Sequence, residues 1–113
     1  MLKLAKYSLH TPYAAAIHNG ISFAYGQLGE FEKSIAAAET ALDINPNYPA
    51  TRRHIAVAQA HLGRLDEAEV QLAIHSKIVP DDTISKIQSR MNLGDTEHAR
   101  RYLEGLRLAG MPE

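Results

Sequence analysis

The chain has 113 residues, and its 12 Lys and Arg side chains nearly balance its 13 Asp and Glu side chains. The absence of cysteine excludes a disulfide framework, a thiolate nucleophile and a cysteine-ligated zinc site. The charge balance lacks the basic excess that is typical of nucleic-acid binding. No apolar run approaches the roughly 20 residues that cross a bilayer. We therefore expect one soluble, cytoplasmic domain that binds neither nucleic acid nor membrane.

The first half of the chain predicts two helices. Abundant alanine and leucine, with little alternation of β-branched residues, favour helix over strand. The first helix is predicted over 12–28, and Gly29 follows it as a residue just past a helix C-terminus. The second is predicted over 31–43 and ends at Asn45-Pro46, because proline disfavours helix in the residue before it.

The next segment repeats this pattern. A third helix is predicted over 49–62, with Pro49 in its first turn and Gly63 after its end. A fourth is predicted over 65–79 and ends before Pro80. Corresponding residues of the two helix pairs are 34 positions apart: Ile21/Ile55, Ala24/Ala58, Leu28/Leu62, Gly29/Gly63, Phe31/Leu65, Ile44/Ile78 and Pro46/Pro80.

A third, shortened unit is predicted after Pro80. Asp81-Asp82 are expected to cap a helix that begins near Thr83. The Leu93-Gly94 pair repeats Leu62-Gly63 only 31 residues later, so the first helix of this unit lacks three residues. Its second helix is predicted over 95–109 and is the best-patterned amphipathic helix of the chain, with one apolar face: Ala99, Tyr102, Leu103, Leu106 and Ala109.

A period of 34 with two helices per unit resembles the tetratricopeptide repeat family. The resemblance implies an all-α fold, a right-handed superhelix of about three helical hairpins. The units would be 12–46, 47–80 and 81–110, within a single domain over 1–113. Residues 1–11 would be the remnant of a preceding helix or turn. Each hairpin has an apolar face that only a neighbouring hairpin can bury.

The tail allows a narrower resemblance. The stretch "TISKIQSRM…EHARRYLEGLRLAGMPE", residues 83–113, is similar to the C-terminal repeat region of bacterial class III adenylate/guanylate cyclase-like proteins. This resemblance implies a regulatory region beside a catalytic domain, and no activity of its own. A cyclase domain needs metal-binding aspartates on a sheet, and no segment here predicts that sheet. The chain is then either part of a longer signalling protein or a free-standing relative.

The family resemblance also implies a binding groove, because the first helices of tetratricopeptide hairpins line a concave surface. The function implied is non-catalytic protein–protein interaction, with a protein or peptide held in this groove. The alternative is a helical domain that binds a small ligand there, which needs a deep apolar cavity. The predicted groove residues, called the groove residues below, are Asn19, Phe23, Gln27, Arg53, Val57 and His61.

No pattern predicts catalysis, a metal or a cofactor. The six histidines include no pair at the i, i+4 spacing of a helical zinc site. No phosphate-binding glycine loop or nucleophile motif occurs. We therefore expect no enzyme activity, no catalytic residues, no bound metal and no cofactor.

Self-association is a further expectation, because short repeat arrays expose apolar ends unless they are capped. A homodimer would form through one end of the array. The candidate residues at the N-terminal end are Leu2, Leu4, Tyr7 and Leu9. Those at the C-terminal end are Leu103, Leu106, Leu108 and Met111.

Overall fold

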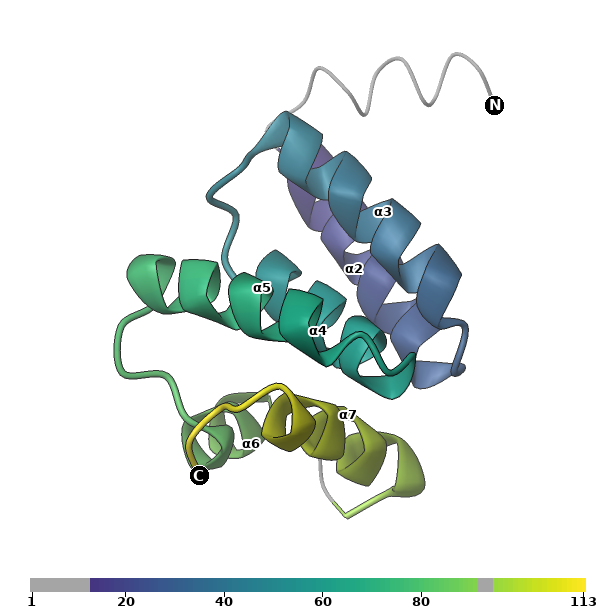
Figure 1. Ribbon diagram of the computed structural model, residues 1–113. Coiled ribbons are helices and arrows are strands. Elements are labelled where there is room, and N and C mark those ends of the chain that lie inside the picture. The colour runs from purple at the N-terminus through teal and green to yellow at the C-terminus, as the bar shows by residue number, and fades with distance from the viewer. Residues whose placement is uncertain (1–12, 92–94) are drawn as a thin grey trace.

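The computed structural model describes residues 13–91 and 95–113, and within them it contains six α-helices and no strand. The helices pair as three hairpins that lie on one another as layers, with α2/α3 uppermost in Figure 1. This arrangement confirms the all-α prediction of stacked helical hairpins. The predicted 1–11 remnant and the Leu93-Gly94 turn lie outside the described residues. The helices are α2 (Ala14–Gln27), α3 (Phe31–Ile44), α4 (Thr51–His61), α5 (Leu65–Ile78), α6 (Ile84–Met91) and α7 (Glu97–Leu108).

Gly29 and Gly63 end the first helices of the first two hairpins in the same way. Their φ angles are 76° and 82°, in the left-handed region that favours glycine. The N–H of the following residue then donates to a carbonyl five residues earlier. These bonds are 2.9 Å long from Glu30 to Tyr25 and 2.8 Å long from Arg64 to Gln59 in the next unit. The repeated Leu-Gly therefore marks the same helix ending twice.

The two helices of the first and of the second hairpin meet through small buried side chains. In the first hairpin, Ser22 and Ser34 each donate from Oγ to the other's backbone carbonyl oxygen at 2.8 Å. The residues 34 positions later are Ala56 and Ala68, and both are fully buried. Small side chains at this crossing let the helix backbones approach closely in both units.

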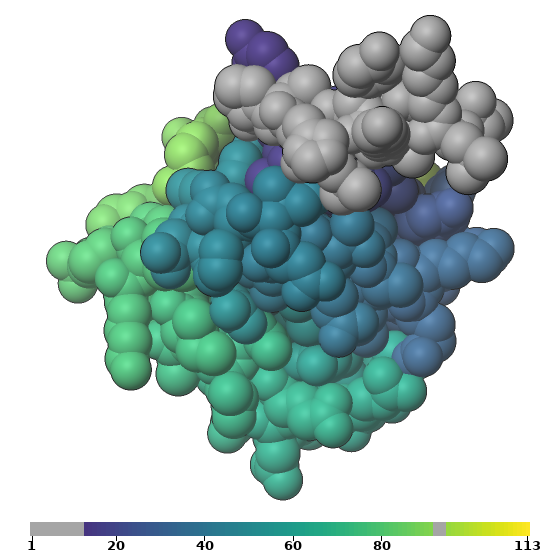
Figure 2. Space-filling view, turned by 90° about the horizontal axis from the view of Figure 1, so that it is seen from above, coloured from purple at the N-terminus to yellow at the C-terminus, as the bar shows by residue number. Residues whose placement is uncertain are grey.

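The hairpins stack through α3, which lies against α4. Figure 2 looks down on the first hairpin, where the blue to blue-green atoms of α3 form the middle of the face. A hydrogen bond adds to this stacking, because Thr51 Oγ1 donates to Asn19 Oδ1 at 2.8 Å. The first two hairpins thus form a regular pair.

The third hairpin makes its main contact through its second helix, because α7 lies against α4. Its first helix, α6, has only 8 residues and contributes Ile84 and Ile87 to the core. The core between the second and third hairpins consists of Ala56, Val57, Ala60, Ala68, Leu72, Ile84, Ile87, Tyr102, Leu103, Leu106, Ala109 and Met111.

The start of α6 differs from the prediction. Asp81 and Asp82 were the expected caps, but Thr83 caps this helix, since its Oγ1 accepts from the Lys86 N–H at 3.1 Å. The Asp82 side chain instead turns inward, where it meets cationic groups and a histidine. The chain after α7 returns to the same point, and the Ile84 N–H donates to the Pro112 carbonyl at 2.8 Å.

The contact between α7 and α4 is closest at Gly105. A Cβ atom at this position would lie 2.8 Å from Val57 Cγ1 and 3.1 Å from Val57 Cα. The Val57 backbone cannot give way without moving α4. Glycine at 105 therefore sets how closely α7 docks.

We expect Gly105→Ala to lower the free energy of unfolding. Overpacking a tight contact costs about 1–3 kcal/mol, which a gain in helix propensity of at most about 1 kcal/mol offsets in part. The control is Gly26→Ala, where the new Cβ would lie 3.6 Å from Ser34 Oγ, an ordinary contact. Urea denaturation should show a loss for Gly105→Ala only; equal stability of the two variants would contradict this account of the α4–α7 contact.

Candidate functional site

The groove residues lie together on two neighbouring helices. Asn19, Phe23 and Gln27 of α2 are half-buried, and so is His61 at the end of α4. Arg53 and Val57 of α4 are buried, each with 4% of its surface exposed. The surface therefore has an accessible part, on α2 and at the end of α4, and a covered part at Arg53 and Val57.

The covering element is α7. The ring of Tyr102 lies 5.5 Å from that of Phe23 in an edge-on arrangement. His61 Nε2 donates to the Arg101 carbonyl at 2.7 Å, and Arg101 Nη1 donates to the Gln27 carbonyl at 3.3 Å. An amphipathic helix of the same chain therefore lies across the predicted groove.

A buried polar cluster fixes α7 to α4. Arg53 Nε donates to the Tyr102 hydroxyl at 2.9 Å, and this hydroxyl lies 2.9 Å from His54 Nδ1. Burial, with the nearby charge of Arg53, lowers the pKa of His54 to about 3. The neutral imidazole can then accept a hydrogen bond at Nδ1 from the Tyr102 hydroxyl, while the Tyr102 oxygen accepts a hydrogen bond from Arg53 Nε. Both buried partners of the hydroxyl are satisfied.

Asp82 continues the cluster toward α5 and α6. Its carboxylate lies 2.8 Å from His75 Nε2 of α5, 3.4 Å from Arg90 Nη2 of α6 and 3.7 Å from Arg53 Nη1 of α4. Burial acts to raise the pKa of Asp82, but hydrogen bonds from His75 and Arg90 and the charge of both arginines outweigh it, so the pKa is lowered. An ionised Asp82 thus balances the buried Arg53.

His75 is neutral in this cluster. Burial lowers the pKa of His75 more than its hydrogen bond to Asp82 raises it. Its Nε2–H then donates to the carboxylate, and its buried Nδ1 has no hydrogen-bond partner among the described residues. Apart from Arg90, whose side chain is 51% exposed, the members of the cluster are buried and paired with one another, so the cluster acts as a structural lock between helices.

The sequence did not predict this cluster. Asp82 was interpreted as a helix cap, and Tyr102 as one residue of an apolar face. One feature of the sequence points to a buried polar residue. His75 stands 34 positions after Ala41, which is fully buried, so the repeat places this histidine in the interior. Arg53 was assigned to the groove surface, but the structure places it inside the lock.

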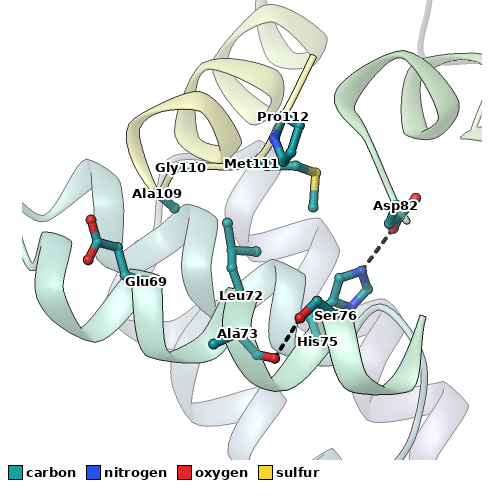
Figure 3. A pocket seen from close by; sticks show the side chains of 10 residues that line it. All are labelled: Glu69, Leu72, Ala73, His75, Ser76, Asp82, Ala109, Gly110, Met111 and Pro112. Atoms are coloured by element: carbon teal, nitrogen blue, oxygen red, sulfur yellow. Dashed lines mark hydrogen bonds and ion pairs between the residues drawn. The ribbon is translucent and has the colours of Figure 1, made fainter. Parts of the chain in front are cut away.

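A separate cleft of about 360 Å³ lies between α5 and the residues that follow α7 (Figure 3). Leu72 and Met111 approach each other across it, and the hydrogen-bonded pair of His75 and Asp82 closes one end. None of the groove residues lines this cleft. The space beside α5 is thus distinct from the predicted binding surface.

The described residues bring together no cluster of three or more His, Asp or Glu side chains that could hold a metal. None of the helices in 13–91 and 95–113 has the length and apolar character needed to cross a membrane.

Stacked helical hairpins with a 34-residue repeat define a helical-repeat protein. Within this class, the chain belongs to the tetratricopeptide repeat family, whose sequence model matches residues 27–90, more than half of the chain. Members of this family generally mediate protein–protein interactions and are typically not catalysts. No curated protein and no solved structure matches the chain.

We expect Asp82→Asn to destabilise the fold strongly, because it leaves Arg53 as an uncompensated buried charge. Breaking a buried ion pair in this way costs about 3–5 kcal/mol. The neighbouring Asp81→Asn is the matched control, since Asp81 is exposed and asparagine tolerates its φ of 63°. Chemical denaturation of both variants checks this, and similar stabilities would contradict the role given to Asp82.

Acidification should also destabilise the fold. The pKa values of His54 and His75 are lowered on folding, so the unfolded chain binds protons first as the pH falls below about 6.5. The free energy of unfolding should decrease from pH 7 to pH 4, by up to about 1.4 kcal/mol per pH unit for each histidine. Protonation of unfolded Asp82 adds to the loss below about pH 4, because its folded pKa is also lowered.

The variant His54→Gln should flatten this pH dependence, because it removes a buried imidazole whose pKa is lowered on folding. Urea midpoints measured across the pH range give the slopes. An unchanged slope in His54→Gln would show that His54 is not held neutral by burial.

Proposed function

We propose that this protein is a non-catalytic interaction module that holds a protein or peptide partner against the groove residues. The observation that carries the proposal is that the groove already accepts a helix, because α7 lies along α4 there. Family membership supports the general function. A partner helix or extended segment would use the same mode of recognition beside α7.

The accessible part of the groove defines the contact. Asn19, Phe23 and Gln27 of α2, with His61 of α4, are half-exposed, and they offer two amides, an aromatic ring and an imidazole. Arg53 and Val57 take part indirectly, because they hold α7 as the opposite wall. A partner with backbone or side-chain polar groups would pair with the amides, and an apolar side chain would pack on Phe23.

The finer proposals concern the larger protein to which this module belongs, its cellular compartment and its self-association. The similarity of residues 83–113 to cyclase-like proteins supports a role as the regulatory C-terminal region of such a signalling protein, in the cytoplasm. An in-frame catalytic domain encoded upstream of Met1 in the source DNA would support this role. A stop codon just upstream would contradict it. Self-association through an exposed end of the array is part of the same proposal.

Binding of a small ligand is the alternative function. At the groove residues α7 already fills the space over Arg53 and Val57. The cleft of about 360 Å³ beside α5 has the size of a small-molecule site, and Leu72 and Met111 give it apolar walls. This alternative predicts binding at the cleft with no protein partner at α2.

A photo-crosslinking amino acid at position 19 should capture the protein partner in a native extract of the source cells. The same residue placed at Val70, which is 58% exposed on α5, is the control. We expect a discrete adduct from position 19, absent from position 70 and reduced by excess unlabelled protein. Adducts from position 70 alone, or none from either, would contradict binding at the groove.

A further inference from the structure

The ionisable side chains that the described residues bury all lie in one cluster, between the second and third hairpins. The buried polar side chains that join the two helices of the first hairpin are Ser22 and Ser34, which have no group that titrates between pH 5 and pH 7. A change of protonation in the interior therefore acts at one junction of the array. The buried ionisable residues are Arg53, His54, His75, Asp82 and Tyr102.

The charges of this cluster are unequal before any histidine gains a proton. The charged groups that face His54 and His75 are two guanidiniums and one carboxylate, from Arg53 of α4, Arg90 of α6 and Asp82. Helix α2, whose Phe23 ring lies 5.2 Å from that of His54, has no charged side chain. Each proton added to an imidazole thus increases a positive charge that is already in excess.

Protonation of His54 also reverses a hydrogen bond between α4 and α7. Neutral Nδ1 accepts from the Tyr102 hydroxyl, and the hydroxyl oxygen accepts from Arg53 Nε. An imidazolium has an N–H at both ring nitrogens and accepts no hydrogen bond. The Tyr102 hydroxyl would then face two donors and lose the acceptor of its own proton, so the added proton opposes the docking of α7.

The third hairpin, the lowest layer in Figure 1, is the unit that this opposition can open. Helical repeats contact only their neighbours, and proteins open locally in units that coincide with such motifs. We propose that mild acid releases the third hairpin from α4 as a unit, while the first two hairpins stay folded. The release uncovers Arg53 and Val57, which are buried at neutral pH. The release needs no partner, but its use in binding rests on the proposed function.

The direction of the pH dependence follows from the two histidines. Burial lowers the pKa of His54 and of His75 in the folded chain. Such groups favour the released form as the pH falls below their unfolded value of about 6.5, by up to about tenfold per pH unit for each histidine. From pH 7 to pH 5 the two histidines together shift the equilibrium by up to about a thousandfold. Asp82 does not contribute in this range, because its carboxylate stays ionised in both forms above about pH 4.

Hydrogen exchange of the full chain between pH 7 and pH 4 tests the release, with rates corrected for the intrinsic effect of pH. Amides of α7 should lose up to about a thousandfold of their protection by pH 5. They should also reach the rates of an open chain at a higher pH than the amides of α3. Loss of protection by both helices at the same pH would mean that the chain unfolds as one unit. Unchanged protection of α7 would mean that acid does not act there, and either result would overturn the proposal.

The variant His54→Gln tests the source of the effect. Glutamine takes up no proton, so only His75 remains and the loss of α7 protection by pH 5 should fall to about thirtyfold. The comparison uses the change with pH within each protein, so a variant that is less stable throughout is still informative. An equally large change in the variant and in the natural chain would overturn the role of the cluster.

A single introduced thiol tests whether the α4 surface is uncovered, because the chain has no cysteine of its own. Val57 is 4% exposed where α7 lies on α4, and Val70 is 58% exposed on α5. The rate at which Val57→Cys reacts with a dipyridyl disulfide is divided by the rate for Val70→Cys, which corrects for the effect of pH on the thiol. This ratio should rise steeply from pH 7 to pH 5, and a constant ratio would contradict the release.

The release and the proposed function can fail separately. Exchange and thiol reaction are measured on the chain alone, whereas the crosslinking residue at position 19 reports a partner. An adduct at position 19 without acid release leaves groove binding intact and removes the release. Acid release without an adduct retains the release and removes the groove as a binding site.

Discussion

The ion pair between Arg53 and Asp82 is the interaction on which the arrangement of the third hairpin depends. Arg53 also donates to the Tyr102 hydroxyl and approaches Met91 Sδ at 3.2 Å, so one guanidinium contacts residues from three parts of the chain. A buried charge tolerates little displacement, because each lost contact leaves it unsatisfied. The cluster thus gives α7 a defined position on α4, which an alanine-rich and featureless apolar surface would specify less well.

This buried cluster decides which of the predicted groove residues stay exposed. In a regular third unit the first helix would lie against α5, as α4 lies against α3, but α6 has only 8 residues, and α7 lies against α4. Gly105 permits the close approach, and Tyr102 joins the polar cluster. The same residues that complete the fold therefore cover Val57 and move the accessible surface toward α2.

The helices could be predicted from the sequence because their limits are local. Glycine at 29 and 63 and proline at 46 and 80 act within a few residues, and the 34-residue repeat confirms each assignment with a second copy. The groove surface depends on contacts across the chain, such as the bond between Arg53 and Tyr102, 49 positions apart. A family register assigns Arg53 to the concave side, but it cannot show that a shortened third unit brings another helix over it.

The two ends of the array differ in how much of their apolar surface is exposed. At the C-terminal end, Leu103, Leu106 and Met111 are buried within the chain, so of the four residues expected to associate there only Leu108 is exposed. At the other end, Ile17 and Ile21 are 47% and 40% exposed in the described part of the chain. Terminal repeats normally carry a polar outer face for solubility. Among the described residues, the first hairpin departs from this pattern, because the exposed part of α2 carries isoleucine at both positions.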